Sequence, residues 1–96
     1  MKAVAPPGDG RLKLRLYIAG SAPNSLRALA NARAICDEHF KANHDLEIVD
    51  LLKNPERAAA DGIIVTPTLL KLSKPSGRLI GSLSDTAEVL QVLQNR

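Results

Sequence analysis

Apolar and polar side chains alternate strictly from Leu12 to Ile18, near the start of the chain. Successive strand residues point to opposite faces, so the three leucines and Ile18 share one apolar face and a strand is predicted over 12–18. Short runs rich in Leu, Ile, Val and Thr, bounded by turn residues, predict three more strands. These strands are expected over 46–51, 68–72 and 78–81.

A helical spacing of apolar residues follows the first strand. Gly20 and Pro23 break the strand, and Asn24 or Ser25 is expected to cap a helix that runs to about Lys41. Apolar residues in this segment recur every three or four positions, which is typical of a helix with one buried stripe. The stripe consists of Ala28, Leu29, Ala32, Ile35, Cys36 and Phe40.

Two shorter helices are predicted in the second half of the chain. Pro55 stands in the first turn of one and Gly62 ends it, whereas Ser84 or Asp85 caps the other, which contains residues 89–94. The resulting order is β-α-β-α-β-β-α, in which both β-α-β units favour parallel neighbours and the last two strands form an antiparallel hairpin. Helices on both faces of a small mixed sheet indicate the α/β class and a thioredoxin-like fold.

The length of 96 residues allows one domain with one core. We expect residues 1–11 to form a flexible N-terminal tail and residues 12–96 to form a single domain. No apolar run approaches the length that spans a membrane, and the first residues lack the apolar segment of a signal peptide. A cytoplasmic location is therefore predicted, in agreement with a single cysteine and a reducing compartment.

The chain is basic, with a formal net charge of +3 and a pI of about 9.4. Its Lys and Arg residues are dispersed, and aromatic residues make up only 2% of the chain, which leaves little for stacking against bases. These observations argue against a nucleic-acid partner. A mildly basic surface is better matched to an acidic protein partner.

The segment Val65-Thr66-Pro67-Thr68 places a proline directly before a predicted strand. An X-Pro bond is the one peptide bond that readily becomes cis, so the Thr66–Pro67 bond is predicted to be cis and to place Thr68 at the strand start. Thioredoxin-like redox proteins have this motif opposite a Cys-x-x-Cys loop. Here the equivalent loop, 19–25, contains no cysteine, so disulfide reductase activity is not expected.

Other chemistry is weakly supported by the sequence. Ser25 lacks a His or an acid at a spacing that would activate it, and Cys36 with His39 would make only half of a metal site. No catalytic residue, metal or cofactor is therefore predicted. One enzymatic alternative stays open: a thiol-handling or glutathione-binding protein, in which Thr66–Pro67 and Ser84–Asp85 would hold the tripeptide.

Five segments together resemble the KaiB family, over about residues 12–93. They are Leu14–Gly20, Pro23–Leu29, Ile48–Pro55, Thr66–Leu69 and Ile80–Asp85. The chain departs from the family pattern in a shortened run over Ser73–Gly77 and in Ser82, which replaces an aspartate. These departures indicate a divergent homologue.

The resemblance implies a non-enzymatic regulator that binds a KaiC-type ATPase and modulates its phosphorylation and ATPase cycle. The role would belong to a circadian clock or to a clock-like stress response. The family is metamorphic, so the resemblance also implies an alternative fold that assembles as a tetramer, and self-association as a dimer or tetramer. Because residues 89–94 combine helix and strand formers, they do not decide the state, and we expect the thioredoxin-like form at rest.

The resemblance further implies a basic interface for an acidic ATPase ring. By position in the motifs, Lys71 and Arg78 are the expected partner-binding residues, with Arg27 on the first helix as a third. The alternative for each of these residues is a solvated surface charge, and for Arg27 this is the favoured interpretation. Thr66, Pro67 and Thr68 are expected to serve the architecture.

Overall fold

The computed structural model describes residues 11–94. Residues 1–10 of the expected N-terminal tail lie outside the described residues. The tail's last residue, Arg11, is held to the domain: its Nη2 donates to Asp45 Oδ1 at 2.7 Å and to the carbonyl oxygen of His44 at 3.0 Å. Position 11 therefore belongs structurally with the first strand.

The element order is the predicted one, with bounds that differ from the prediction by no more than three residues. The elements are β1 (Leu12–Ile18), α1 (Pro23–His39), β2 (His44–Asp50), α2 (Pro55–Ala60), β3 (Thr68–Lys71), β4 (Gly77–Ile80) and α3 (Thr86–Leu93). Residues 89–93, whose composition left helix and strand open, are helical.

The sheet is mixed and has the order β2-β1-β3-β4. β1 and β2 are parallel, as the first β-α-β unit predicts, whereas β3 is antiparallel to β1 and β4 is antiparallel to β3. The expectation of parallel neighbours from the second β-α-β unit is therefore wrong. The six residues of α2 span about 9 Å, much less than the seven-residue strand β2, so α2 does not carry the chain back along the sheet.

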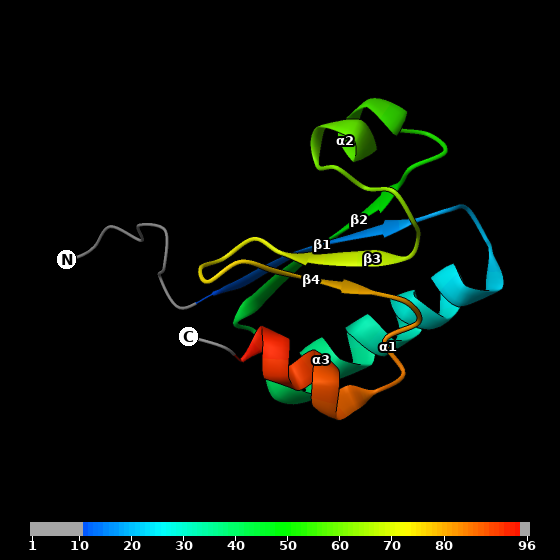
Figure 1. The fold of residues 1–96 in the computed structure, drawn as a ribbon. Helices are drawn as coiled ribbons and strands as arrows, with labels where there is room; N and C mark the ends of the chain where they lie inside the picture. Colours follow the sequence, from blue (N-terminus) through cyan, green and yellow to red (C-terminus); the bar gives the residue numbers. More distant parts are fainter. Residues whose placement is uncertain (1–10, 95–96) are drawn as a thin grey trace.

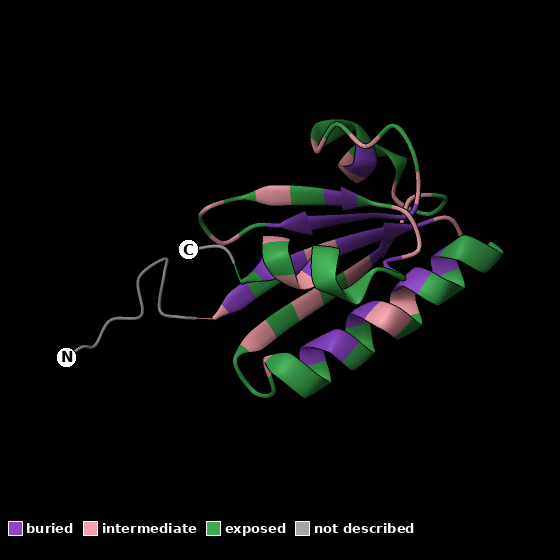
Figure 2. Ribbon diagram, turned by 60° about the horizontal axis from the view of Figure 1, so that its bottom comes forward, coloured by how far each residue is buried: buried purple, intermediate pink, exposed green. Residues whose placement is uncertain are grey.

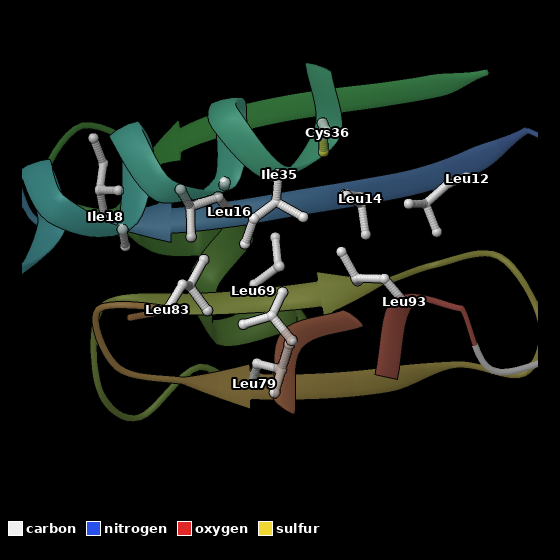
Figure 3. Close-up of a cluster of buried hydrophobic side chains, with 13 residues drawn as sticks. Leu12, Leu14, Leu16, Ile18, Ile35, Cys36, Leu69, Leu79, Leu83 and Leu93 are labelled. Atoms are coloured by element: carbon white, nitrogen blue, oxygen red, sulfur yellow. The ribbon is translucent and has the colours of Figure 1, made fainter. Parts of the chain in front are cut away.

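The two faces of the sheet are covered unequally. α1 and α3 lie against one face, and α2 lies alone over the other (Figure 1). Between the sheet and the α1–α3 pair lies the larger core, whose aliphatic side chains converge from both layers (Figure 3). Its buried members are Leu12, Leu14, Leu16, Ile18, Ala28, Ala32, Ile35, Cys36, Leu69, Leu79, Leu83, Val89 and Leu93.

The cluster under α2 is smaller. Tyr17, Val49, Ala58 and Leu70 are its buried members. β3 contributes to both clusters because it lies inside the sheet, and all four of its residues are buried. β4, at the edge of the sheet, alternates between buried and exposed positions instead (Figure 2).

The helix caps follow the sequence only in part. Asp85 precedes α3 and its carboxylate accepts from the Glu88 backbone N–H at 3.1 Å, as predicted. The predicted caps of α1 are wrong, because the helix begins at Pro23 and Ala22 occupies the cap position without a side-chain hydrogen bond. Proline suits this first position because its missing N–H would be unbonded there. Within residues 11–94, no helix is long and apolar enough to cross a membrane.

Candidate functional site

The loop between β1 and α1, which would hold the redox cysteines in a thioredoxin, is held by the hydroxyl group of Ser25. Ser25 is 1% exposed, and its Oγ accepts from the Ala19 backbone N–H at 3.0 Å. Gly20 adopts a positive φ of 55°, and its N–H donates to Asp50 Oδ1 at 3.1 Å. Ser25 therefore fixes the loop from within and offers no accessible nucleophile.

The Thr66–Pro67 peptide bond is cis, as predicted, and β3 starts at Thr68. Thr68 is 2% exposed and its Oγ1 donates to the carbonyl oxygen of Val65 at 2.7 Å. The Gly81 N–H donates to the carbonyl oxygen of Pro67 at 3.0 Å. These bonds join the proline motif to the end of β4.

Cys36 belongs to the larger core and is 1% exposed. Burial raises the pKa of its thiol to about 11, with a smaller contribution from the charge of Asp37, so the thiol is protonated at neutral pH. Within residues 11–94, no group of three or more His, Cys, Asp or Glu side chains is placed to hold a metal ion. The structure thus assigns Cys36 to packing.

Ser84 and Asp85, which were considered for glutathione recognition, form hydrogen bonds within their own segment. The Asp85 carboxylate caps α3, and the Ser84 Oγ lies 2.6 Å from Ser82 Oγ. The single thiol of the chain, that of Cys36, is 1% exposed and lies near the C-terminal end of α1 in the larger core. Nothing in this geometry favours the enzymatic alternative.

The three predicted partner-binding residues lie in different environments, and Lys71 is not at the surface. It is 4% exposed, because it is the last residue of the interior strand β3 and pairs with Leu14 of β1 and Gly77 of β4. The surface exposure expected of Lys71 is therefore wrong for this conformation. Arg27 is exposed on α1, where its Nη1 donates to Asn24 Oδ1 at 3.2 Å.

Arg78 is exposed on the edge strand β4 and has a fixed guanidinium group. Its Nη1 donates to the carbonyl oxygen of Gly62 at 3.2 Å, and its Nη2 donates to that of Asp61 at 3.0 Å. No ion pair within residues 11–94 includes Arg78. The side chain is thus oriented by neutral oxygens while its charge has no carboxylate to balance it, an arrangement suited to an acidic partner.

A polar network that sequence reasoning missed joins α2 to the sheet. Arg15 donates from Nε to Glu47 Oε1 at 2.8 Å and from Nη1 to Asp61 Oδ2 at 2.9 Å. Arg57 Nη1 lies 2.8 Å from Glu47 Oε2. The Tyr17 hydroxyl lies 2.6 Å from Asp61 Oδ2, to which it donates, and 3.0 Å from the Arg57 carbonyl oxygen.

The network shifts the pKa values of its two carboxylates so that their charged forms are favoured. Hydrogen bonds from Arg57 and then Arg15 lower the pKa of Glu47 to about 2. The bond from Tyr17, followed by that from Arg15, lowers the pKa of Asp61. Burial raises the pKa of Tyr17, which therefore stays a neutral donor. The strand register Arg15↔Glu47 creates this network, and register could not be read from the sequence.

Large apolar side chains remain exposed beside Arg78. Ile64 is 92%, Val65 46% and Ile80 64% exposed. The segment that contains Ile64 and Val65 lies along β4, because Arg78 bonds to Gly62 and Asp61, and because Pro67 accepts from Gly81. We call Ile64, Val65, Arg78 and Ile80 together the β4 flank. The apolar run from Ile63 to Val65 in an expected loop was an available signal, although Ile63 packs against the smaller cluster and only Ile64 and Val65 stay exposed.

The sequence is similar to one family throughout the described domain. The family described as KaiB domain matches residues 15–95. The circadian clock oscillator protein KaiB of Prochlorococcus marinus (strain MIT 9313) is 50% identical over 78 residues, which are 80% of this chain and 66% of that relative. The protein of the same name from Microcystis aeruginosa is 47% identical over 80% of this chain and 75% of its own length. This chain thus spans about two thirds to three quarters of these relatives.

Solved structures agree on the thioredoxin-like fold. The N-terminal domain of SasA from Synechococcus elongatus matches with a TM-score of 0.75 at 21% identity, over 100% of this chain and 91% of that domain. Thioredoxin of Fasciola hepatica matches with a TM-score of 0.71 at 21% identity, over 91% of this chain and 83% of that one. At this level of identity the likeness concerns the fold alone.

Proposed function

The chain belongs to the KaiB family, and from this premise we propose that it is a regulatory protein that binds a KaiC-type ATPase and modulates its phosphorylation and ATPase cycle. KaiB proteins are clock oscillator proteins and form a non-enzymatic family. The buried Ser25 and the protonated Cys36 agree with a protein that acts by binding. The setting would be a circadian clock or a clock-like stress response.

The observation that carries the proposal at the level of geometry is the guanidinium of Arg78. It is exposed, oriented by the carbonyl oxygens of Gly62 and Asp61, and unbalanced by any carboxylate within residues 11–94. The Asp61 carboxylate is occupied by Arg15 and Tyr17 and so does not neutralise it. A carboxylate of the ATPase would complete this group. Arg27 is proposed as a second contact, and Lys71, being buried, as a support of the sheet beneath the surface.

Binding is tested with a purified KaiC-type ATPase, with and without ATP, by measuring association rates at low and high salt. Charge contacts chiefly set association rate and salt dependence, so Arg78→Glu should slow association about tenfold or more at low salt and much less at high salt. Arg33→Glu is the matched control: Arg33 is exposed on α1, away from β4, and its reversal changes the net charge equally.

Two results would contradict the proposal. If the unaltered protein binds no KaiC-type ATPase in either nucleotide state, the partner is wrong. If Arg33→Glu slows association as much as Arg78→Glu, net charge explains the effect and the proposed contact is wrong. An altered phosphorylation or ATPase rate of the partner on addition of the protein would support the regulatory half of the proposal.

Three further features belong to the same proposal. We place the protein in the cytoplasm, where a KaiC-type partner would be met. The thioredoxin-like form described here is proposed as the form at rest and as the binding form, with α3 helical throughout 86–93. Self-association as a dimer or tetramer would accompany the family's alternative fold. Backbone chemical shifts that show a strand over residues 88–93 in the free protein would contradict this assignment.

A further inference from the structure

β4 has an unpaired side. It is the last strand of the sheet, and among the described residues only β3 is hydrogen-bonded to it. In an antiparallel pair, opposite residues alternate between bonded and non-bonded pairs. The Gly81 N–H donates to the carbonyl oxygen of Pro67, which stands opposite it when the register is extended by one pair. The backbone N–H and C=O groups of Leu79 therefore point toward β3, and those of Arg78 and Ile80 point away from it.

The side chains at these two positions are exposed as well. Arg78 and Ile80 lie two residues apart and therefore on the same face of the sheet, the face with α2. The exposed Ile64 and Val65 lie next to them. The β4 flank therefore combines unpaired backbone N–H and C=O groups, an apolar surface and the guanidinium group of Arg78. In Figure 2 the β4 ribbon runs along one margin of the sheet, with no neighbouring strand on its outer side.

The opposite edge of the sheet differs in charge. The side chains of β2 that lie along that edge include Asp45 and Glu47, and both are neutralised within the chain. Arg11 pairs with Asp45 at 2.7 Å, and Arg57 pairs with Glu47 at 2.8 Å. Arg78 on β4 has no such partner among the described residues. The carboxylate of Asp50, the last residue of β2, accepts from the backbone N–H groups of Gly20 and Leu52, so within the described part of the chain the exposed edge-strand charge that remains without a counter-ion is that of Arg78 on β4.

We propose that β4 accepts a fifth strand, an extended segment of a protein partner that places one apolar side chain against Ile80 and, two residues away, one acidic side chain against Arg78. Strand addition supplies main-chain hydrogen bonds for affinity, and the side chains on one face supply selectivity. The inference rests on the proposed function, because it describes what the partner protein presents. It does not depend on that partner's identity.

The probe is a capped six-residue peptide with the sequence Thr-Val-Thr-Glu-Thr-Val. Its valines and its glutamate stand two residues apart and so share one face of an extended strand. Its binding to the isotope-labelled protein is followed by amide chemical shifts and hydrogen exchange. The expected result is slower exchange at Arg78 and Ile80, with Leu79 unchanged because its amide already faces β3. The amides of Asp45 and Glu47, on the other edge, should not respond.

Matched probes separate strand addition from other modes of binding. The same peptide with lysine in place of glutamate should bind about tenfold more weakly, as expected for the loss of one charge-assisted contact. Arg78→Glu should reverse that preference, whereas Arg33→Glu should leave it unchanged. N-methylation of the peptide amides that face β4 should abolish binding, because strand addition needs those donors.

Several outcomes would overturn the inference. The inference is wrong if the peptide does not bind at its millimolar solubility limit, or if it binds without protecting the amides of Arg78 and Ile80. It is also wrong if the glutamate and lysine peptides bind equally, or if a single-stranded oligonucleotide at equal concentration displaces the peptide. The proposed function fails separately. If the peptide adds to β4 but no KaiC-type ATPase binds, only the function is wrong; if the ATPase binds without protecting these two amides, only the inference is wrong.

Discussion

The two faces of the sheet are built by different physical means. The face under α1 and α3 is closed by aliphatic side chains, with Leu14 and Leu16 at 2% and 0% exposure. The face under α2 has a small apolar cluster around Tyr17, and the helix is held by the ion pair of Arg57 with Glu47 and, at its C-cap, by that of Asp61 with Arg15. The first face supplies most of the apolar burial, while the second leaves the β4 flank open to solvent. Most of the apolar burial and the proposed recognition surface therefore lie on opposite sides of one sheet.

Adjacent leucines of β3 provide the most direct test of this contrast. Leu69 points into the larger core and is 1% exposed, and Leu70 points into the smaller cluster and is 7% exposed. Leu69→Ala should lower the free energy of unfolding by about 4 kcal/mol and Leu70→Ala by about 2 kcal/mol, because the smaller cluster can relax around the cavity. Urea denaturation measures both values, and equal losses would refute the contrast.

Acid should weaken the α2 face first. The pKa of Glu47 lies at about 2 in the folded state, below its ordinary value of 4.5, so its ion pairs stabilise the fold above about pH 4.5 and this stabilisation is lost as the pH falls through about 2. The lowered pKa of Asp61 acts in the same direction. Since the Glu47 side chain is 44% exposed, its pair with Arg15 contributes at most about 1 kcal/mol.

The measurement is hydrogen exchange between pH 5 and 2, compared for the amides of α2 and α1. Amides of α2 should lose protection before those of α1, and Glu47→Gln should remove part of this acid dependence. Asp37→Asn is the control, because Asp37 is exposed on α1 and forms no ion pair within residues 11–94. Loss of protection at the same pH in both helices would show that the network does not hold α2 separately.

Arg78→Glu should have the smallest effect on stability. Its guanidinium is exposed and donates only to backbone carbonyl oxygens, so the free energy of unfolding should change by about 0.5 kcal/mol or less. A thermal or urea melt compared with that of Arg33→Glu measures the difference. A larger loss would mean that Arg78 holds the loop of residues 61–67 in place, and binding defects of this variant would then have a structural origin.

Local patterns predicted most of the fold. Alternation located β1, helical spacing located α1, and the Asp85 cap of α3 is as expected. The caps of α1 were wrong because a proline at the first position replaced a side-chain cap, and Ser25, a good capping residue, is used inside the loop instead. Local propensity could not distinguish these two uses of one hydroxyl.

The candidate site was less predictable, because it depends on how strands are ordered. Lys71 resembles a surface lysine in the sequence, yet it is buried, since β3 lies between β1 and β4. The exposure of Arg78 follows from the position of β4 at the edge. Likewise, the Arg15–Glu47 pair requires the parallel register of β1 and β2, which no local pattern encodes.

The central place of β1 also has a consequence for biosynthesis. β1 pairs through Leu14–Tyr17 with β3, a strand that the ribosome delivers only after β1, α1 and β2 are complete. Until then, the nascent chain has an unpaired strand edge flanked by leucines, which is a template for association between chains. Chains that end before Thr68 should therefore aggregate more readily than the full-length chain.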